Sequence, residues 1–297
     1  MPSEGNSSIS VTTIANDATV TKTWQIDMAG VHISVTAAGE PSVQLVDVAL
    51  SAIESHGENI RPSIELLVTQ NGPNWLLVDQ QVQQQWTLTK AGDLIYHLTD
   101  RIVFHIADKA SGVHCVHAAA VAKNGRAMVI PANSGAGKSS FTTWLVSQGF
   151  DYLSDELVLI DDSYQLTGLS RPIQIKKSGV DAINGLVTSK ESFLRGDFAS
   201  ALAISGLGGA VCEPRPQKLS LMVFPHYVSG ADFSFKALSS AEAGMAIMEN
   251  HVNARSLDGH GFSAMMALVK GTPCYALEYG GFDTLPHDFS TQLSSLL

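Results

Sequence analysis

The stretch AMVIPANSGAGKSSFTTWLVSQG, residues 127–149, decides the fold class of this chain. It opens with four apolar residues typical of a short buried strand and passes through Gly135-Ala136-Gly137-Lys138-Ser139. It then continues over residues 141–147 with a helical pattern that ends before Gly149. Strand, glycine loop and helix in this order are the context that a phosphate-binding loop requires. We therefore expect an α/β chain with such a loop near its centre.

The glycine loop matches the second half of the Walker A pattern, although Ala132 stands where the strict pattern has glycine. Consecutive backbone N–H groups and the following helix N-terminus favour bound phosphate, and glycines let the backbone come close to it. Lys138 is expected to reach the β- and γ-phosphates, and the Ser139 hydroxyl to bind Mg²⁺. An ordinary Gly-rich turn before a helix is the alternative. The residues expected to bind nucleotide are Asn133, Ser134, Gly135, Ala136, Gly137, Lys138, Ser139, Ser140 and Lys176.

An acidic pair, Asp155 and Glu156, begins 17 residues after Lys138, beyond one helix and a short strand. A crossover of that length returns a parallel strand beside the first one, which would bring both carboxylates near the phosphates. Phosphoryl transfer to a hydroxyl uses such a carboxylate as Mg²⁺ ligand or as proton acceptor. The alternative is an exposed acidic turn, which is the interpretation we favour for Asp161 and Asp162.

Other polar residues near the loop are open to two interpretations. His117 lies in the apolar strand before the loop strand, where a lone histidine is more often a hydrogen-bonded core residue than a functional one. Arg171, Lys176 and Lys177 form the densest basic cluster of the chain. These cations could neutralise triphosphate charge, or they could form a solvated surface.

Composition excludes several classes of protein. With 18 Lys and Arg against 28 Asp and Glu, the net charge of −10 disfavours non-specific binding to nucleic acid. Hydrophobic residues make up 45% and charged residues 15%, which is typical of a chain with a large core. No apolar run approaches the ~20 residues that span a bilayer, and residues 1–13 are polar and lack signal-peptide features. We expect a cytoplasmic protein without nucleic-acid or membrane partners.

Two domains are expected, a β-rich region over residues 1–105 and a kinase-like region over residues 106–297. Alternating apolar residues around Trp24 and Ile33 indicate one hairpin, and residues 64–68 and 75–78 indicate another. Residues 45–53 fit a helix or a strand equally, whereas residues 92–107 have the spacing of an amphipathic helix. Further strands are expected at residues 113–122, 157–160, 219–224 and 274–277, and further helices at residues 241–250 and 262–269.

The sequence VHAAAVAKNGRAMVIPANSGAGKSSFTTWLVSQGFDYLSDELVLI, residues 116–160, resembles the HPr kinase/phosphorylase family, and most of all the HPr-kinase-related proteins. The similarity extends over roughly residues 105–280. It implies the phosphoenolpyruvate-carboxykinase-like P-loop fold. It also implies that His117 is the active-site histidine, that Lys138 and Ser139 bind phosphate and Mg²⁺, and that Asp155 is the proton acceptor. Glu156 replaces the second aspartate of the family. Oligomers are common in this family, so a homo-oligomer is possible.

The function that these observations indicate is an ATP- and Mg²⁺-dependent kinase that phosphorylates a hydroxyl, most often seryl, of a protein or peptide. Asp155 would orient or deprotonate the acceptor, with Glu156 beside it, while Arg171 or Lys176 offsets charge. The alternatives are a non-catalytic nucleotide-binding partner in peptide maturation or regulation, and a small-molecule kinase. The β-rich region would dock the substrate by strand addition at its sheet edge, or it would only cover the core or form an oligomer interface.

Overall fold

The computed structural model describes residues 20–55, 61–212 and 215–297, so the polar residues 1–13 lie outside the described residues. The chain is mixed α/β, with sheets of five, eight and three strands. Among the described residues, every helix is too short or too polar to cross a lipid bilayer.

The five-stranded sheet is built from the first 90 residues. Its strands, in spatial order, are β1 (Thr21–Met28), β2 (Val31–Ala38), β3 (Ile64–Asn71), β4 (Asn74–Asp79) and β5 (Gln84–Leu88). Both predicted hairpins are confirmed, because β1 pairs with β2 and β3 with β4 in antiparallel register. The helix α1 (Glu40–Leu50) connects the parallel strands β2 and β3, which settles the ambiguous segment at residues 45–53 as mainly helical.

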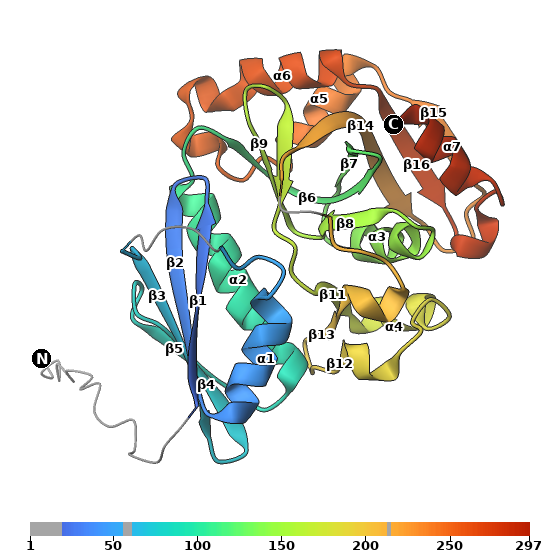
Figure 1. Ribbon diagram of the computed structural model, residues 1–297. Helices are drawn as coiled ribbons and strands as arrows, with labels where there is room; N and C mark the ends of the chain where they lie inside the picture. Colours follow the sequence, from blue (N-terminus) through green and yellow to red (C-terminus); the bar gives the residue numbers. More distant parts are fainter. Residues whose placement is uncertain (1–19, 56–60, 213–214) are drawn as a thin grey trace, which may run out of the picture.

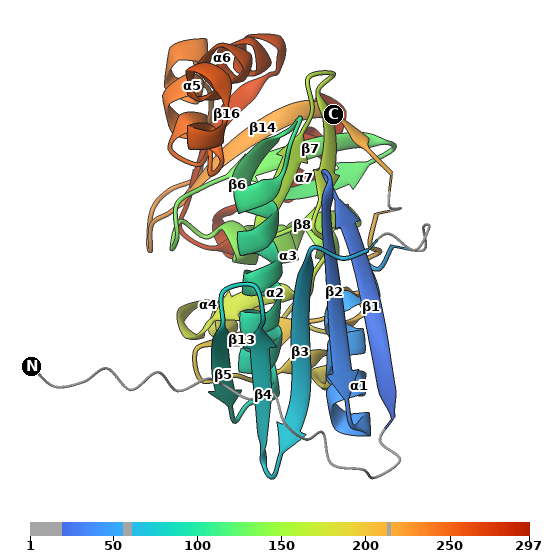
Figure 2. The same cartoon turned by 90° about the vertical axis from the view of Figure 1, so that its left-hand side faces the viewer.

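The helix α2 (Ala91–Lys109) confirms the amphipathic pattern, and it lies between the five-stranded sheet and the rest of the chain (Figures 1 and 2). Its apolar residues, among them Leu94, Leu98 and Ile102, are wholly buried. The same buried cluster continues beyond the helix to Cys115 and Leu157. One hydrophobic core therefore crosses the boundary predicted at residues 105 and 106, and α2 is shared between the two regions.

The eight-stranded sheet forms the body of the molecule. Its strands are β10 (Gln165–Gly168), β9 (Leu157–Ile160), β6 (His114–Lys123), β7 (Arg126–Pro131), β14 (Gln217–Tyr227), β16 (Cys274–Tyr279) and β15 (Ser234–Ala237) in spatial order, with β8 (Asp151–Ser154) also paired to β6. Since β7, β14 and β16 are parallel, their carboxyl ends meet at one edge of the sheet. Ligands of α/β sheets bind at such an edge.

Helices cover both faces of this sheet (Figure 1). The helices α3 (Lys138–Ser147) and α7 (Phe289–Leu296) pack on one face, and α5 (Ser240–Met248) and α6 (Phe262–Gly271) pack on the other. A three-stranded sheet of β11 (Ile173–Lys176), β13 (Ala199–Leu202) and β12 (Phe193–Leu194) carries the short helix α4 (Lys177–Ile183) and packs against α2 and α3. The strands and helices predicted after residue 106 are all present, with boundaries shifted by a few residues.

One predicted strand neighbour is wrong. The strand after α3 was expected beside β7, but β8 pairs with β6 instead, with Ala120 opposite Ser154. One edge of β7 is taken by its antiparallel partner β6 and the other by β14, so β8 has no free edge of β7 to join. The strand β8 runs parallel to β7, with β6 between them, and it still ends at the edge where the glycine loop begins.

Candidate functional site

We call residues 131–137, between β7 and α3, the glycine loop. Two of its glycines have left-handed backbone conformations. Gly135 and Gly137 have φ values of +92° and +90°, a region that L side chains rarely adopt. At Gly137 a methyl group would lie 2.6 Å from the Tyr279 hydroxyl oxygen and 3.0 Å from the Tyr227 Cβ. The Tyr227 N–H also donates to the Ala136 carbonyl oxygen at 3.2 Å. The ends of β14 and β16 therefore fix the shape of the loop.

Lys138 begins α3 and points back into the site rather than into solvent. It is 7% exposed, and its Nζ lies 2.6 Å from Nε2 of His117 on β6. Burial lowers the pKa of Lys138 to about 8, although the nearby carboxylates of Glu156 and Asp155 act in the opposite direction. The strand β6 and the helix α3 are thus joined through two side chains that the sequence singled out.

Glu156 completes a three-residue contact. Its Oε1 lies 3.2 Å from the same Nε2 of His117. One ring nitrogen carries at most one proton, so His117 Nε2 either accepts from Lys138 or donates toward Glu156. Burial alone would raise the pKa of Glu156, but the hydrogen bond from His117 and the charges of Arg171 and Lys138 lower it to about 2. Glu156 is 35% exposed, so it presents an ionised oxygen pair to solvent.

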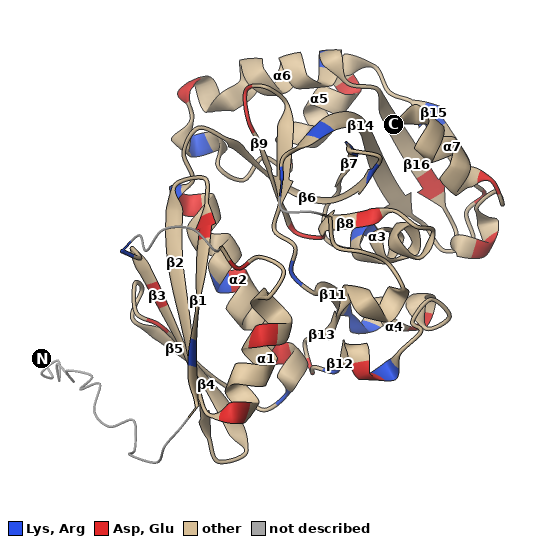
Figure 3. Cartoon of the chain, viewed as in Figure 1, with Lys and Arg blue, Asp and Glu red and all other residues tan. Residues whose placement is uncertain are grey.

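Arg171 lies behind Glu156 and is almost wholly buried, with 2% exposure. It donates from Nη2 to Glu156 Oε2, from Nε to Asp155 Oδ1 and from Nη1 to Thr99 Oγ1, each at 3.0 Å. Burial disfavours its charge, yet Asp155 and Glu156 raise the pKa of Arg171 above its ordinary value. Figure 3 shows the acidic segment after β8 beside the basic residue before β11 at the centre of the molecule. Arg171 therefore acts on the site through Glu156 and not by direct contact with solvent.

Asp155 lies close enough to Lys138 for its charge to act on that lysine, but its side chain faces inward. It is fully buried, and both its oxygens accept hydrogen bonds. Besides Arg171, Oδ1 accepts from the Tyr152 hydroxyl at 3.1 Å, and Oδ2 accepts from the Gln174 N–H at 2.9 Å. Because the side chain is 0% exposed, a metal ion or a substrate would have to displace this packing to reach either oxygen. The accessible carboxylate is the one beside it, Glu156.

The basic residues of the 176–177 segment differ from Arg171. Lys176 Nζ donates to the Ser134 hydroxyl at 2.5 Å and so closes the far side of the glycine loop. Lys177 is exposed. Ser139 and Ser140 are half-buried in the first turn of α3, where backbone N–H groups have no partner within the helix. Asn133 and Ser134 are exposed at the loop's outer edge.

Thr99 is a site residue that sequence reasoning missed. It is wholly buried on α2, where its hydroxyl donates to the Ile95 carbonyl oxygen at 2.8 Å and accepts from Arg171. No motif marks it, because a threonine inside an amphipathic helix has no local signal of function. Its contact with Arg171, 72 residues away, depends on how α2 docks against the large sheet.

A cavity of about 440 Å³ opens on the other side of the glycine loop. Loop residues, the end of β14 and the end of α5 line it, namely Pro131, Ala132, Asn133, Ser134, Gly135, Ala136, Phe224, Pro225, His226, Tyr227, Ala246, Glu249 and Asn250. The backbone of Asn250 accepts from the His117 N–H at 2.8 Å, so this wall is continuous with the strand that carries His117. Lys138, His117 and Glu156 do not line this cavity.

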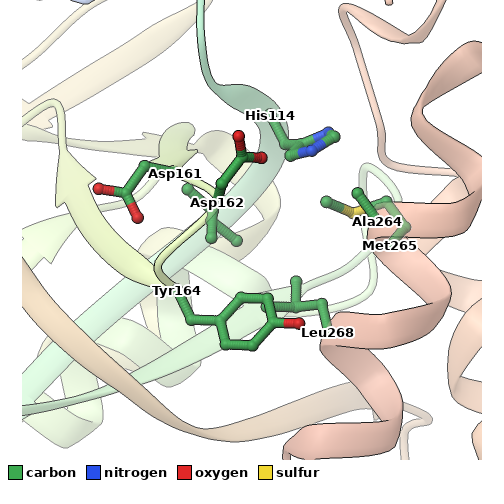
Figure 4. A pocket seen from close by; sticks show the side chains of 8 residues that line it. His114, Asp161, Asp162, Tyr164, Ala264, Met265 and Leu268 are labelled. Atoms are coloured by element: carbon green, nitrogen blue, oxygen red, sulfur yellow. The ribbon is translucent and has the colours of Figure 1, made fainter. Parts of the chain in front are cut away.

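A smaller cavity of about 70 Å³ lies away from the glycine loop, and Figure 4 shows His114, Asp162 and Tyr164 around it. His114 faces the α5 and α6 side of the sheet, and its Nδ1 is 3.3 Å from Nε2 of the buried His251. Asp161 accepts from the Ser163 and Gln165 N–H groups, which confirms the acidic turn expected there. These residues do not join the site.

Comparison with known proteins adds no assignment: no protein-family model matches the chain, and no curated protein is significantly similar to it.

Proposed function

We propose that this chain is an ATP-dependent kinase with a phosphoenolpyruvate-carboxykinase-like P-loop core, and that it transfers the γ-phosphoryl group to a seryl hydroxyl of a protein or peptide. The resemblance to HPr-kinase-related proteins suggests this reaction. One observation supports it above the others: Lys138, His117, Glu156 and Arg171 form an unbroken chain of polar contacts directly at the start of α3. A buried lysine beside an ionised carboxylate at a glycine loop is suited to phosphoryl transfer.

The two sides of the glycine loop suit different parts of ATP. The γ-phosphate belongs next to Lys138, since that is where the cation and the accessible carboxylate meet. The backbone N–H groups from Gly135 to Ser140 suit the β- and α-phosphates, with Lys176 closing the loop through Ser134. The nucleoside then extends away from the carboxylate into the 440 Å³ cavity, where Tyr227 is 43% exposed.

Mg²⁺ fits the donors at this position. Within the described part of the chain, no group of three or more His, Cys, Asp or Glu side chains could hold a metal ion by itself. Mg²⁺ binds through one or two protein oxygens together with substrate phosphates and retained waters. Ser139 is the residue that would hold it together with the substrate phosphates, and when bound it would neutralise phosphate charge.

The acceptor reaction then depends on Glu156. Phosphoryl transfer has a loose transition state, so the protein mainly orients the attacking oxygen. Glu156 accepts the hydrogen bond of the seryl hydroxyl, and the seryl oxygen attacks the γ-phosphorus as the bond to the ADP oxygen breaks. The hydroxyl proton passes to the Glu156 carboxylate. Arg171, which is itself paired with Asp155, holds Glu156 in position from the buried side.

Phosphorylation of a degenerate serine-peptide library with γ-³²P-labelled MgATP tests this function. The wild type should label peptides, Lys138→Ala should lose labelling at least ~10²-fold because the phosphate cation is missing, and the exposed Lys177→Ala should behave as wild type. Label from α-³²P-ATP should not transfer. ATP binding without peptide labelling would favour a non-catalytic nucleotide-binding protein, and labelling of small alcohols alone would favour a small-molecule kinase.

A further inference from the structure

The helix α2 brings an aromatic side chain to the rim of the site. Tyr96 and Thr99 are three residues apart, so they lie on one side of the helix. Thr99 contacts Arg171, and Arg171 contacts Glu156, each at 3.0 Å. Whereas Thr99 is buried, Tyr96 is half-buried, and burial together with the charges of Asp100 and Glu156 raises its pKa. Tyr96 therefore marks where α2 emerges beside the accessible carboxylate.

A second aromatic residue is held next to Tyr96 in an unusual way. Phe198 is 56% exposed, and its ring centroid lies 4.8 Å from that of Tyr96. Burial does not hold it in place. Instead the buried carboxylate of Asp93, in the first turn of α2, accepts from the Asp197 N–H at 2.8 Å and from the Phe198 N–H at 2.9 Å.

The backbone next to Phe198 is packed closely against the first turn of α2. The Gly92 N–H donates to the Arg195 carbonyl oxygen at 3.1 Å. At Gly196 a methyl group would lie 2.5 Å from Asp93 Oδ1 and 2.0 Å from the Ala199 carbonyl oxygen. A buried acid and two close-packed glycines thus hold the backbone that carries this exposed ring, and the ring itself packs on Tyr96. We call Tyr96 and Phe198 the aromatic shelf.

We propose that the aromatic shelf binds a large apolar or aromatic side chain of the polypeptide acceptor, a few residues from the serine that is phosphorylated. This inference rests on the proposed function. Exposed aromatic rings held in one conformation supply much of the binding energy at protein interfaces, because little conformational entropy is lost. The shelf lies on the Glu156 side of the site, where the attacking hydroxyl must enter.

The position of the shelf also selects the kind of ligand. The Thr99–Arg171 pair lies between the shelf and Glu156, so a molecule that touches both must extend over several side chains. A polypeptide segment does this, whereas a small alcohol does not. The nucleoside is directed to the opposite side of the glycine loop, into the cavity next to Tyr227.

The test compares Phe198→Ala with Phe262→Ala in the full-length protein. Phe262 is a matched control, since it is 55% exposed at the start of α6, outside the site. The wild type should prefer library peptides with a large apolar residue at one fixed distance from serine. With a selected peptide, Phe198→Ala should raise KM about tenfold and flatten the preference, and Tyr96→Ala should do the same, whereas Phe262→Ala should not.

Each other outcome overturns the inference in a distinguishable way. Unchanged KM and selectivity in Phe198→Ala would mean that the shelf does not bind the acceptor. If Phe198→Ala loses MgATP affinity tenfold in calorimetry, the shelf would bind the nucleoside instead. If the wild type forms an oligomer and Phe198→Ala dissociates it in size-exclusion chromatography, the shelf would be an interface between two copies of the chain. If the wild type labels no peptide at all, the proposed kinase function falls, and this inference falls with it.

Discussion

Asp155→Asn should mainly lower the stability of the protein and Glu156→Gln should mainly lower its activity, although the two acids are adjacent in the sequence. Asp155 is fully buried and accepts from Arg171, Tyr152 and Gln174. In an asparagine one oxygen becomes an amide NH₂ group. Whichever way this group turns, it meets a donor, either the Gln174 N–H or the Arg171 and Tyr152 donors. Asp155→Asn therefore leaves the buried Arg171 without the buried one of its two charge partners.

The size of both effects follows from burial. Removing one partner of a buried ion pair costs about 3–5 kcal/mol, which corresponds to a fall in Tm of roughly 6 °C or more in a chain of this size. Glu156 is 35% exposed, and glutamine can still accept from Arg171, so Glu156→Gln should cost only about 0–1 kcal/mol. Its loss of peptide phosphorylation should be about 10²–10⁴-fold, as for a group that accepts the proton of the acceptor.

Urea unfolding followed by circular dichroism gives the stability of both variants, and labelling of a selected peptide gives their activity. MgATP affinity serves as a check that Glu156→Gln still binds nucleotide. The reasoning is refuted if Asp155→Asn unfolds like the wild type while losing activity, because Asp155 would then act on the substrate. It is equally refuted if Glu156→Gln keeps full activity.

Three further predictions concern neighbouring parts of the site. Thr99→Val should lower kcat about tenfold with unchanged MgATP affinity, because Arg171 loses one acceptor, and Thr99→Ser should restore it; equal kcat in both variants would contradict this. Gly137→Ala should destabilise the protein more than Gly135→Ala, since both strain φ but only Gly137 meets Tyr279; equal urea midpoints would count against it. MgATP binding should take up protons above pH 8, because phosphate raises the lowered Lys138 pKa, and calorimetry in buffers of different ionisation enthalpy measures this; zero uptake would exclude it.

Local patterns predicted the elements that carry the site. The apolar run before the glycine loop, the positions of Gly135 and Gly137 and the helix after them depend on neighbours in the sequence, so β7, the loop and α3 could be predicted. The amphipathic spacing of α2 is equally local. The partner of β8 was not predictable in this way, because it depends on which strand edges remain free after β6 and β14 have paired.

The roles within the site depend on packing that the sequence does not contain. Asp155 and Glu156 form the bend between β8 and β9, so no strand alternation indicates which of them faces inward, and that depends on the packing around Arg171. The contribution of α2 through Thr99 and Tyr96 depends on contacts between residues far apart in sequence. A region that appeared to be a separate docking module therefore supplies part of the site itself.

A structure of the full-length protein with Mg²⁺ and a non-hydrolysable ATP analogue tests the central claim most directly. The account predicts the β- and γ-phosphates on the backbone N–H groups of residues 135–140, with Lys138 Nζ moved from His117 to the γ-phosphate and Glu156 facing the acceptor side. An analogue whose phosphates lie away from the glycine loop, or a Lys138 that stays on His117 with the analogue bound, would contradict it.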